Sequence, residues 1–317
     1  MSFPLLRLPC LALEEIVKNC NHKEILFLVQ TSSRARRLIS RHTKSHFVKI
    51  SFVDEIIVPH VQLFYGDQEF FRILIYAEGE NFDSSWKFKT LVPVSYDNEE
   101  QCLLSCWTKY DQAFQEILDF LNEVFRIEDV SLVNNPKDFY RLVPIAEHVA
   151  SKNLKIRSVY WSLFSGNEEM ENRLLTVTKC ATDFKIREMN FFSIRFDHFH
   201  LFRMDRLEID HSSWMTAENV VALRNCKRVR LGSVWFEATD INKILLEYIE
   251  DPGELLELRL TSRKDIRLGD VVTGLNAVEV FDGNHWEGQK FRITGQNGIR
   301  FSATMLWEDT IVITRET

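Results

Sequence analysis

The chain has 317 residues, of which 45% are hydrophobic and 27% are charged, a composition typical of a globular protein large enough for two domains. Its formal net charge of −7 argues against a broad surface for nucleic acid or for an anionic membrane, because both partners require basic faces. No apolar run approaches the roughly 18 residues of a membrane-spanning helix, and Pro4, Arg7 and Pro9 interrupt the N-terminal stretch that a signal peptide would need. We therefore expect an intracellular protein that binds neither nucleic acid nor membrane.

Three helical patterns follow one another in the first forty residues. Pro9 precedes a segment in which apolar residues recur at helical spacing, and Asn21 with Glu24 predicts a capping box at the start of a second helix. Ser32 or Ser33 would cap a third helix, with its arginines directed outward. The second helix is apolar on every side at residues 25–29 and must be covered on every side, either by the rest of the chain or by a partner.

These patterns contain a recognisable motif. Leu8-Pro9-x-x-x-Leu13-x-x-Ile16 is followed by Asn21-x-x-Glu24-Ile25-Leu26 and by a Ser-Ser-Arg-x-Arg-Arg-Leu stretch ending at Leu38. Together they resemble an F-box, which implies a three-helix unit that docks on a Skp-family adaptor and through it on a cullin. Carried over position by position, the resemblance implies these adaptor-facing residues: Leu8, Pro9, Leu13, Ile16, Ile25 and Leu26.

The sequence departs from the usual F-box pattern at Cys20, Thr31 and Ala35, where larger apolar residues are common in the family. The basic stretch from Arg34 to Lys49 lies on the third expected helix. We interpret it as a solvated outer face rather than as a nuclear signal or a phosphate-binding strip.

The rest of the chain alternates between strand and helix patterns. Residues 46–106 are strand-like and irregular, and Asp111 is expected to cap an amphipathic helix. Beyond it, strand-like segments recur at intervals of roughly 20–30 residues, which is typical of a strand–helix repeat related in shape to leucine-rich repeats. Their expected centres are Val130, Val159, Met189, Leu207, Val229, Leu258 and Val278. The expected fold is α+β: a three-helix F-box at residues 1–45, then an irregular, curved, leucine-rich-repeat-like strand–helix platform at residues 46–317.

A second resemblance lies at about residues 199–260. Its motifs are Ser213-Trp214-Met215-Thr216-x-Glu218-Asn219, Asn225-Cys226-Lys227-x-Val229-x-Leu231, Thr239-Asp240-Ile241-Asn242-Lys243 and Leu255-x-x-Leu258. They are similar to the F-box-associated type 2 domain, which accompanies an F-box in a large nematode family and implies substrate recruitment. The resemblance assigns no substrate-binding residue. Within the motif, Thr216 and Thr239 are expected to cap helices.

Several residue clusters could be mistaken for reactive sites. His198 and His200, near Asp197, Asp205 and His211, would share a face of a strand, but the neighbouring aromatic residues favour ordinary packing over a metal site. Cys102 and Cys106 could share one face of a helix, yet no second pair completes a zinc site, and the sequence has no CxxC. Trp214 and Trp235 are either partner anchors or core residues.

The sequence contains no GxGxxG, P-loop, HExxH or GxSxG motif, so we expect neither a cofactor, nor a metal, nor catalysis. The predicted function is that of a substrate-recognition subunit of an SCF-type ubiquitin ligase, which bridges a Skp-family adaptor to a target protein. The alternative is an interaction scaffold that has lost adaptor binding.

Overall fold

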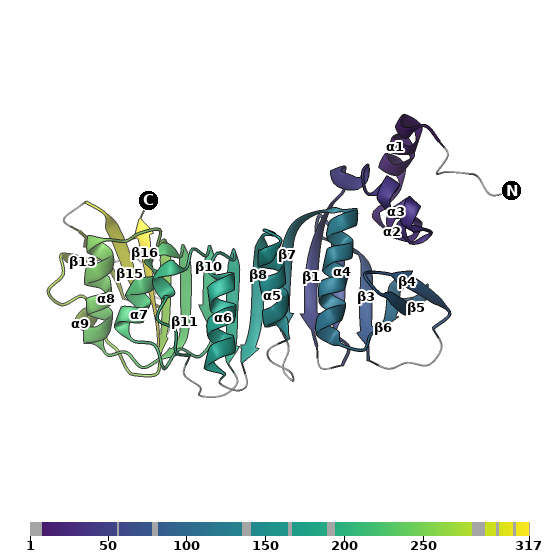
Figure 1. The fold of residues 1–317 in the computed structure, drawn as a ribbon. Coiled ribbons are helices and arrows are strands. Elements are labelled where there is room, and N and C mark those ends of the chain that lie inside the picture. The colour runs from purple at the N-terminus through teal and green to yellow at the C-terminus, as the bar shows by residue number, and fades with distance from the viewer. Residues whose placement is uncertain are drawn as a thin grey trace. The chain divides into compact units, whose positions relative to one another are not determined.

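The computed structural model describes residues 8–55, 57–77, 82–134, 141–163, 167–188, 194–280, 289–295, 298–306 and 309–316. The chain forms two compact units, Met1–Arg157 and Ser158–Thr317, shown as ribbons in Figure 1. Among the helices of these described ranges, none has the length and apolar character that crossing a bilayer requires.

The first unit begins with three short helices, α1 (Cys10–Asn19), α2 (His22–Gln30) and α3 (Ser33–Ile39), followed by the 3-10 turn η2 (Thr43–Ser45). The capping box expected at α2 is confirmed: the Glu24 amide donates to Asn21 Oδ1 at 2.8 Å, and the Asn21 amide donates to the Glu24 carboxylate at 2.8 Å. Ser32 Oγ accepts a hydrogen bond from the Ala35 amide at 3.0 Å, so Ser32 is the cap of α3.

A mixed sheet follows in the order β7-β1-β2-β3-β6-β5-β4. Strand β1 is parallel to β7, and β3 is parallel to β6, while the remaining neighbours are antiparallel. Helices α4 (Tyr110–Val124) and α5 (Leu142–Ser151) lie on one face of this sheet (Figure 1). The strands are β1 (Phe47–Asp54), β2 (His60–Tyr65), β3 (Gln68–Tyr76), β4 (Ser84–Lys87), β5 (Leu91–Asp97), β6 (Cys102–Cys106) and β7 (Arg126–Asn134).

The second unit alternates parallel strands with helices. Strands β8, β9, β10, β11 and β12 run parallel in chain order, then β16 pairs antiparallel with β12 and the sheet ends β16-β15-β14-β13. The strands are β8 (Ile156–Leu163), β9 (Asp183–Glu188), β10 (Arg206–Ile209), β11 (Arg228–Val234), β12 (Glu257–Ser262), β13 (Ala277–Glu279), β14 (Lys290–Thr294), β15 (Arg300–Leu306) and β16 (Thr310–Glu316). The connections contain α6 (Glu168–Thr178), η3 (Phe199–Leu201), α7 (Ala217–Ala222), η4 (Leu223–Asn225), α8 (Ala238–Glu250) and α9 (Leu268–Val271).

Register aligns the core of this unit in rows across the strands. One row joins buried residues of five neighbouring strands: Val159, Phe184, Leu207, Val229 and Leu258. Two residues further along each strand, a second buried row is Trp161, Ile186, Ile209, Leu231 and Leu260. Because side chains alternate across a strand, the residues between these rows point to the opposite face of the sheet.

The helical N-terminus and the mixed strand and helix content confirm an α+β fold. The leucine-rich-repeat-like form of the platform stays a prediction, as does a domain boundary at residue 45, although β1 starts close to it at Phe47. The strand expected around Met189 is β9, which ends at Glu188, so that Met189 lies outside the described residues.

Two predicted helix caps are each wrong by two residues. Helix α4 begins at Tyr110 with Lys109 as its N-cap, which places Asp111 inside the first turn. Helix α8 begins at Ala238, because Glu237 and Asp240 form a reciprocal capping box and Thr239 lies within the helix. By contrast, Thr216 does cap α7, through a capping box with Asn219.

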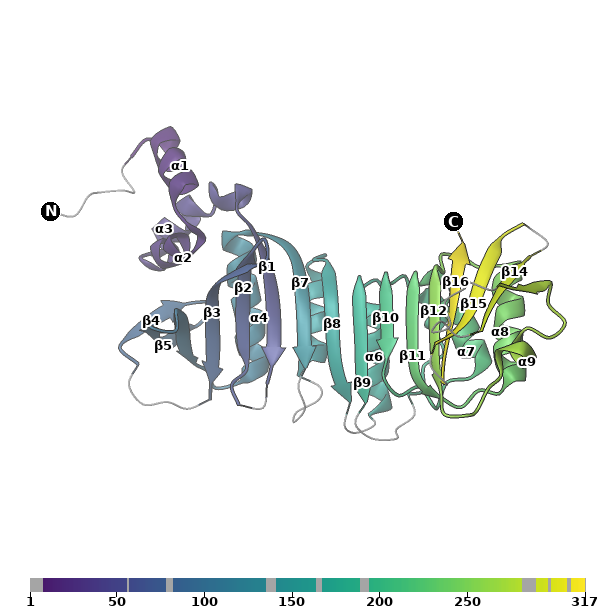
Figure 2. The ribbon, with the colours of Figure 1, turned by 180° about the vertical axis from the view of Figure 1, so that it is seen from behind.

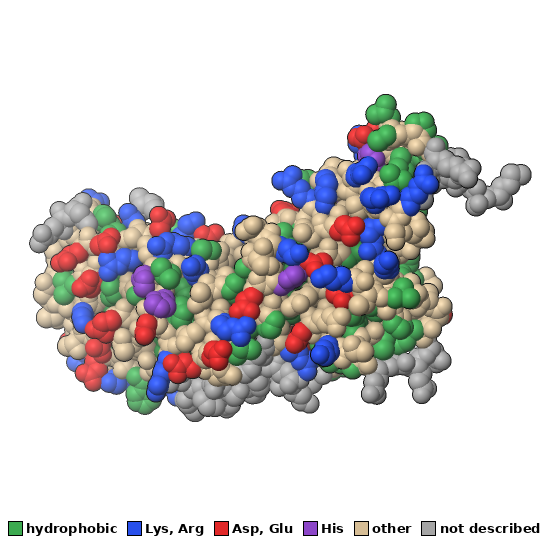
Figure 3. Space-filling view, in the orientation of Figure 1, with side chains coloured by type: hydrophobic (Ala, Val, Ile, Leu, Met, Phe, Trp, Pro, Cys, Tyr) green, Lys and Arg blue, Asp and Glu red, His purple; other side chains and the backbone are tan. Residues whose placement is uncertain are grey.

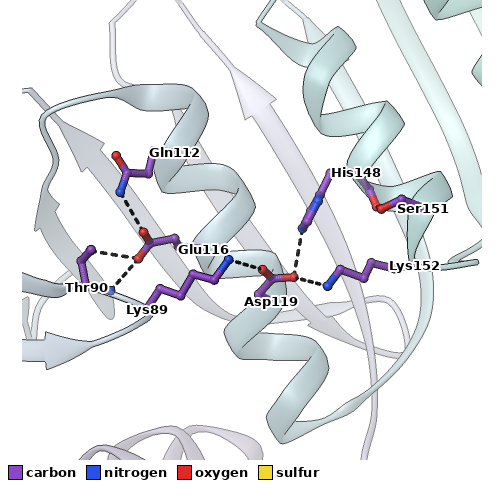
Figure 4. A network of polar contacts seen from close by, with 8 residues as sticks. All are labelled: Lys89, Thr90, Gln112, Glu116, Asp119, His148, Ser151 and Lys152. Atoms are coloured by element: carbon purple, nitrogen blue, oxygen red, sulfur yellow. Dashed lines mark hydrogen bonds and ion pairs between the residues drawn. The ribbon is translucent and has the colours of Figure 1, made fainter.

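A polar network joins α4, α5 and the β4–β5 turn (Figure 4). Asp119 of α4 accepts a hydrogen bond from His148 Nε2 at 2.9 Å, forms an ion pair with Lys152 at 2.8 Å, and lies 3.7 Å from Lys89 Nζ. Burial opposes ionisation of Asp119, but the hydrogen bonds from Lys152 and His148 outweigh burial and hold the pKa of this carboxyl below its ordinary value.

We expect Asp119→Asn to destabilise the first unit by about 1–3 kcal/mol at pH 7, because the His148 ring and the Lys152 ammonium lose their shared partner. Since the folded state lowers the pKa of Asp119, its contribution is present above the ordinary carboxyl pKa and is lost as pH falls through the folded value. Urea unfolding measures the effect. Asp67→Asn, a nearly fully exposed carboxylate, is the control and should change stability by less than about 0.5 kcal/mol.

Candidate functional site

The structure separates the six predicted adaptor-facing residues into two groups. Leu13, Ile25 and Leu26 are 3%, 0% and 0% exposed and form the interior of the three N-terminal helices. Leu8 and Ile16 are half-buried, and Pro9 is exposed. The role of all six in adaptor binding stays a prediction, and only the second group reaches the surface.

Helix α1 also presents an apolar residue that the sequence analysis missed. Leu11 is 77% exposed, and it lies off the stripe that points into the core. The Cys10 thiol lies 3.6 Å from His42 Nε2, which places the first turn of α1 beside the C-terminal end of α3. A leucine in the first turn of an amphipathic helix, two residues after a proline cap and off the apolar stripe, is the signal that could have identified it.

Arginines form a row on the neighbouring helix and just beyond it. Arg34 and Arg37 lie three residues apart on α3, and Arg41 follows its C-cap, Ser40; all three are exposed, and none of their side chains has a partner within the described residues. Figure 3 shows basic side chains gathered on these helices below a group of hydrophobic ones. Leu8, Pro9 and Leu11 with these three arginines are called here the F-box surface.

Arg36 does not follow the outward direction expected for it. Its guanidinium lies 4.8 Å from the centre of the Phe120 ring and 3.9 Å from the Glu123 carboxylate, and it donates to the Lys87 carbonyl oxygen. Arg36 therefore joins α3 to α4 and β4 instead of facing solvent.

The rest of the chain covers one side of α2. The Phe27 ring packs edge-on against Tyr96 at 5.2 Å, Trp86 at 5.4 Å and Phe71 at 6.1 Å between ring centres. Three strands of the first sheet, β5, β4 and β3, therefore contact this side chain. Of the two coverings left open by the sequence, the chain itself therefore supplies at least this one.

Polar contacts fasten the end of the helical unit to the C-terminal end of α4. Lys44 Nζ donates to the carbonyl oxygens of Asn122, Glu123 and Phe125 at 3.0, 3.1 and 3.3 Å, and Thr43 Oγ1 donates to the carbonyl oxygen of Val124. A cation is favoured here because a helix C-terminus carries unpaired carbonyls and partial negative charge.

Two histidines lie inside the same junction. The rings of His22 and His46 are 5.1 Å apart, and His22 also contacts Tyr65 at 4.6 Å and Phe70 at 5.1 Å. Burial lowers the pKa of both imidazoles, and the neighbouring His46 lowers that of His22 further. Both rings are therefore held neutral in the folded chain near pH 7.

The residues weighed for metal binding do not assemble into a site. No group of three His, Cys, Asp or Glu side chains suited to a metal occurs in the part of the chain that the structure describes. The rings of His198 and His200 are 5.8 Å apart beside the Phe196 and Phe199 rings. Cys102 and Cys106 lie on strand β6 and not on a helix, so the expectation of a shared helical face is wrong.

The two candidate tryptophan anchors differ. Trp214 is half-buried, stacks on Phe199 with 6.1 Å between ring centres, and donates to the His211 carbonyl oxygen at 3.2 Å. It also lines a surface cavity of about 660 Å³ between α6 and the start of α7. Trp235 is 55% exposed and follows β11.

Serine, histidine and aspartate do meet at one place, but not as a nucleophilic triad. Asp119 accepts from the His148 ring, whereas Ser151 Oγ donates to the His148 backbone carbonyl oxygen at 2.7 Å (Figure 4). A triad needs the hydroxyl bonded to the imidazole, so this set joins α4 to α5 without activating Ser151.

Comparison with known proteins agrees with the N-terminal geometry. Residues 5–46 match the model of the F-box domain family. A Caenorhabditis elegans protein, the Skn-1 dependent zygotic transcript 15 protein, is 24% identical over 287 residues, which covers 86% of this chain and 83% of that protein. No solved structure matches the chain.

Acidification should loosen the helical unit. Because the pKa values of His22 and His46 are lower in the folded than in the unfolded chain, the unfolded chain binds more protons as pH falls through about 6.5, and stability falls with it. We expect hydrogen exchange of the α2 amides to accelerate between pH 7 and pH 5.5, beyond the intrinsic effect of pH. His22→Phe should reduce this acceleration, and His200→Phe, at an exposed histidine, should leave it unchanged; an equal response in both variants would contradict the assignment.

Proposed function

Because the chain is a nematode-type F-box protein, we propose that it is the substrate-recognition subunit of an SCF-type ubiquitin ligase. In this role it bridges a Skp-family adaptor, and through it a cullin, to a target protein inside the cell. The observation that carries the proposal is the F-box match at residues 5–46, together with the exposed part of those helices.

The contacts between the F-box helices and the first sheet support a bridging role. Phe27, Lys44 and Arg36 tie the helices to strands and to α4 through separate kinds of contact: ring packing, charge-assisted hydrogen bonds and an ion pair. A bridge of this kind accelerates transfer by holding two partners together, which raises their effective concentration and requires no catalytic residue on this chain.

The F-box surface has the composition of a protein-binding surface. Leu8, Pro9 and Leu11 offer apolar contact next to a helix that carries unpartnered arginines. Apolar centres provide affinity and charged rims provide orientation and association rate. Leu13, Ile25 and Leu26 would then contribute by shaping the helices from inside.

Two features support a second function, that of an interaction scaffold. The chain covers Phe27 with its own strands, and Cys20, Thr31 and Ala35 are small or polar where the family usually has larger apolar residues. These features favour a scaffold whose F-box helices pack on their own platform without adaptor binding.

The first test is adaptor binding by the variant Leu11→Asp. A carboxylate introduced at the centre of an apolar contact should weaken co-purification with a recombinant Skp-family adaptor roughly tenfold or more, because the contact would desolvate the charge. Ile57→Asp is the matched control, since Ile57 is 88% exposed and follows the far end of β1. Adaptor binding by neither the wild type nor the variants would favour the scaffold. Charges at Leu13 or Leu26 are unsuitable for this test, because they would unfold the helices.

The arginine row should control the rate of adaptor association. We expect Arg34→Gln with Arg37→Gln to lower the association rate constant roughly tenfold at low salt, with a smaller difference at high salt. Surface plasmon resonance with the immobilised adaptor measures this rate. The double variant Arg228→Gln with Arg230→Gln, which removes the same charge from exposed positions of β11, is the control and should associate at the wild-type rate.

A further inference from the structure

Within the described ranges, the sheet of the second unit has one face without helices. Helices α6, α7 and α8 lie behind the strands in Figure 2, and the strands themselves face the viewer. Residues of β10, β11 and β12 alternate between buried and accessible, so that the side chains between the two buried rows point to this open face.

Register places arginines directly opposite one another on that face. Arg206 of β10 pairs with Arg228 of β11, and Arg230 of β11 pairs with Arg259 of β12. All four side chains are exposed. Neighbouring strands are about 4.7–4.9 Å apart, so each pair brings the Cβ atoms of two arginines close together.

Glu257 stands in register beside Arg228, and Glu208 beside Arg230, but among the described residues the carboxylates of the sheet form ion pairs only with the outer members of this group and with Lys185. Arg206 is 4.0 Å from the Asp183 carboxylate, and Arg259 forms an ion pair with Glu257 at 2.5 Å. Glu208, the acidic residue in register with Arg230, forms its ion pair with Lys185 instead, at 3.1 Å.

The two arginines of the central strand, β11, form none of these ion pairs. Neither Arg228 nor Arg230 has a side-chain partner among the described residues, although the chain as a whole carries a net charge of −7. Opposed like charges on neighbouring strands destabilise a sheet, and nothing in the packing of the two buried rows requires arginine at these positions. A residue pattern that opposes folding and is not needed by the core is typical of a binding surface.

We propose that Arg206, Arg228, Arg230 and Arg259, called here the arginine square, bind an anionic segment of the target protein, with clustered carboxylates or phosphates as the bound groups. Guanidinium groups suit this chemistry because their planar donor pairs match both anions. The inference rests on the proposed function, since it names the chemistry by which that function would select a target.

The size of the square favours a peptide over a nucleic acid. The two rows of two arginines are offset by one strand, so together they span about 10 Å across β10, β11 and β12 and about 7 Å along them, which is enough for one or two anionic groups. The row of Arg206 and Arg228 is flanked by Asp183 and Glu257, and Glu208 lies beside the row of Arg230 and Arg259, followed by Lys185. These acidic residues interrupt any continuous basic track across the strands. A nucleic-acid backbone would require such a track.

The test measures binding of fluorescent nonapeptides to the full-length chain by anisotropy. Three peptides share one sequence and differ at three adjacent positions, which hold serine, glutamate or phosphoserine. We expect at least tenfold tighter binding of an anionic peptide than of the serine peptide, and the glutamate and phosphoserine peptides distinguish a carboxylate ligand from a phosphate ligand. Arg228→Gln with Arg230→Gln should abolish the preference. The control, Arg195→Gln with Arg267→Gln, removes two exposed arginines outside the square and should retain it.

A second measurement separates binding from a structural role. Because the substitutions relieve repulsion between like charges, the urea midpoint of Arg228→Gln with Arg230→Gln should equal or exceed that of the wild type, while peptide binding is lost. Equal binding of all three peptides, loss of the preference in the control, or tighter binding of a single-stranded oligonucleotide would each overturn the inference. None of these measurements uses the adaptor, so failure of adaptor binding would count against the proposed function alone.

Discussion

The ammonium group of Lys44 satisfies three backbone carbonyls at the C-terminal end of α4, and much of the first unit is arranged around that contact. Residues on both sides of it continue directly into the centre of the sheet: Phe47 starts β1, Arg126 starts β7, and the two are paired in register. The Arg126 guanidinium also lies 4.9 Å from the Phe47 ring centre. The end of the helical unit, the end of α4 and the start of two central strands therefore meet at one corner, and a change at any of them affects the others.

This corner also explains why the F-box residues separate into interior and surface groups. Because Phe27 packs on the sheet and Arg36 points toward Phe120, one side of α2 and one side of α3 make contacts within the chain. The first turn of α1 and the outer side of α3 are accessible, and Leu11 and the arginine row lie there. An adaptor that binds here would meet a surface already held in place, and little conformational entropy would be lost on binding.

Sequence reasoning predicted features whose partners lie within a few residues. The capping box of Asn21 with Glu24, the Ser32 cap and the Thr216 cap are local contacts, and they were predictable because each joins positions three apart. Thr239 shows the limit of this reasoning, because Glu237, two residues earlier, can also cap the helix and is the residue that does so.

Features that depend on distant segments were not predictable in the same way. In the sequence Arg36 is indistinguishable from its outward-facing neighbours. Its inward direction depends on contacts with Phe120 and Glu123, which lie more than eighty residues further along the chain. The candidate adaptor residues were taken from a motif, and a motif does not state whether a leucine faces the core or a partner. The arginine square requires the register of three strands, and each of its members alone is an ordinary exposed charge in an alternating strand.

The alternation of buried and accessible residues along β10, β11 and β12 has an evolutionary consequence. Core residues and open-face residues alternate along the same strands, so mutations can alter one set while the other is conserved. Substitutions at the accessible positions would change the sign or spacing of charge on the face without creating a cavity or a clash beneath it. Duplicated copies of such a gene could diverge in what they recognise while inheriting the same fold.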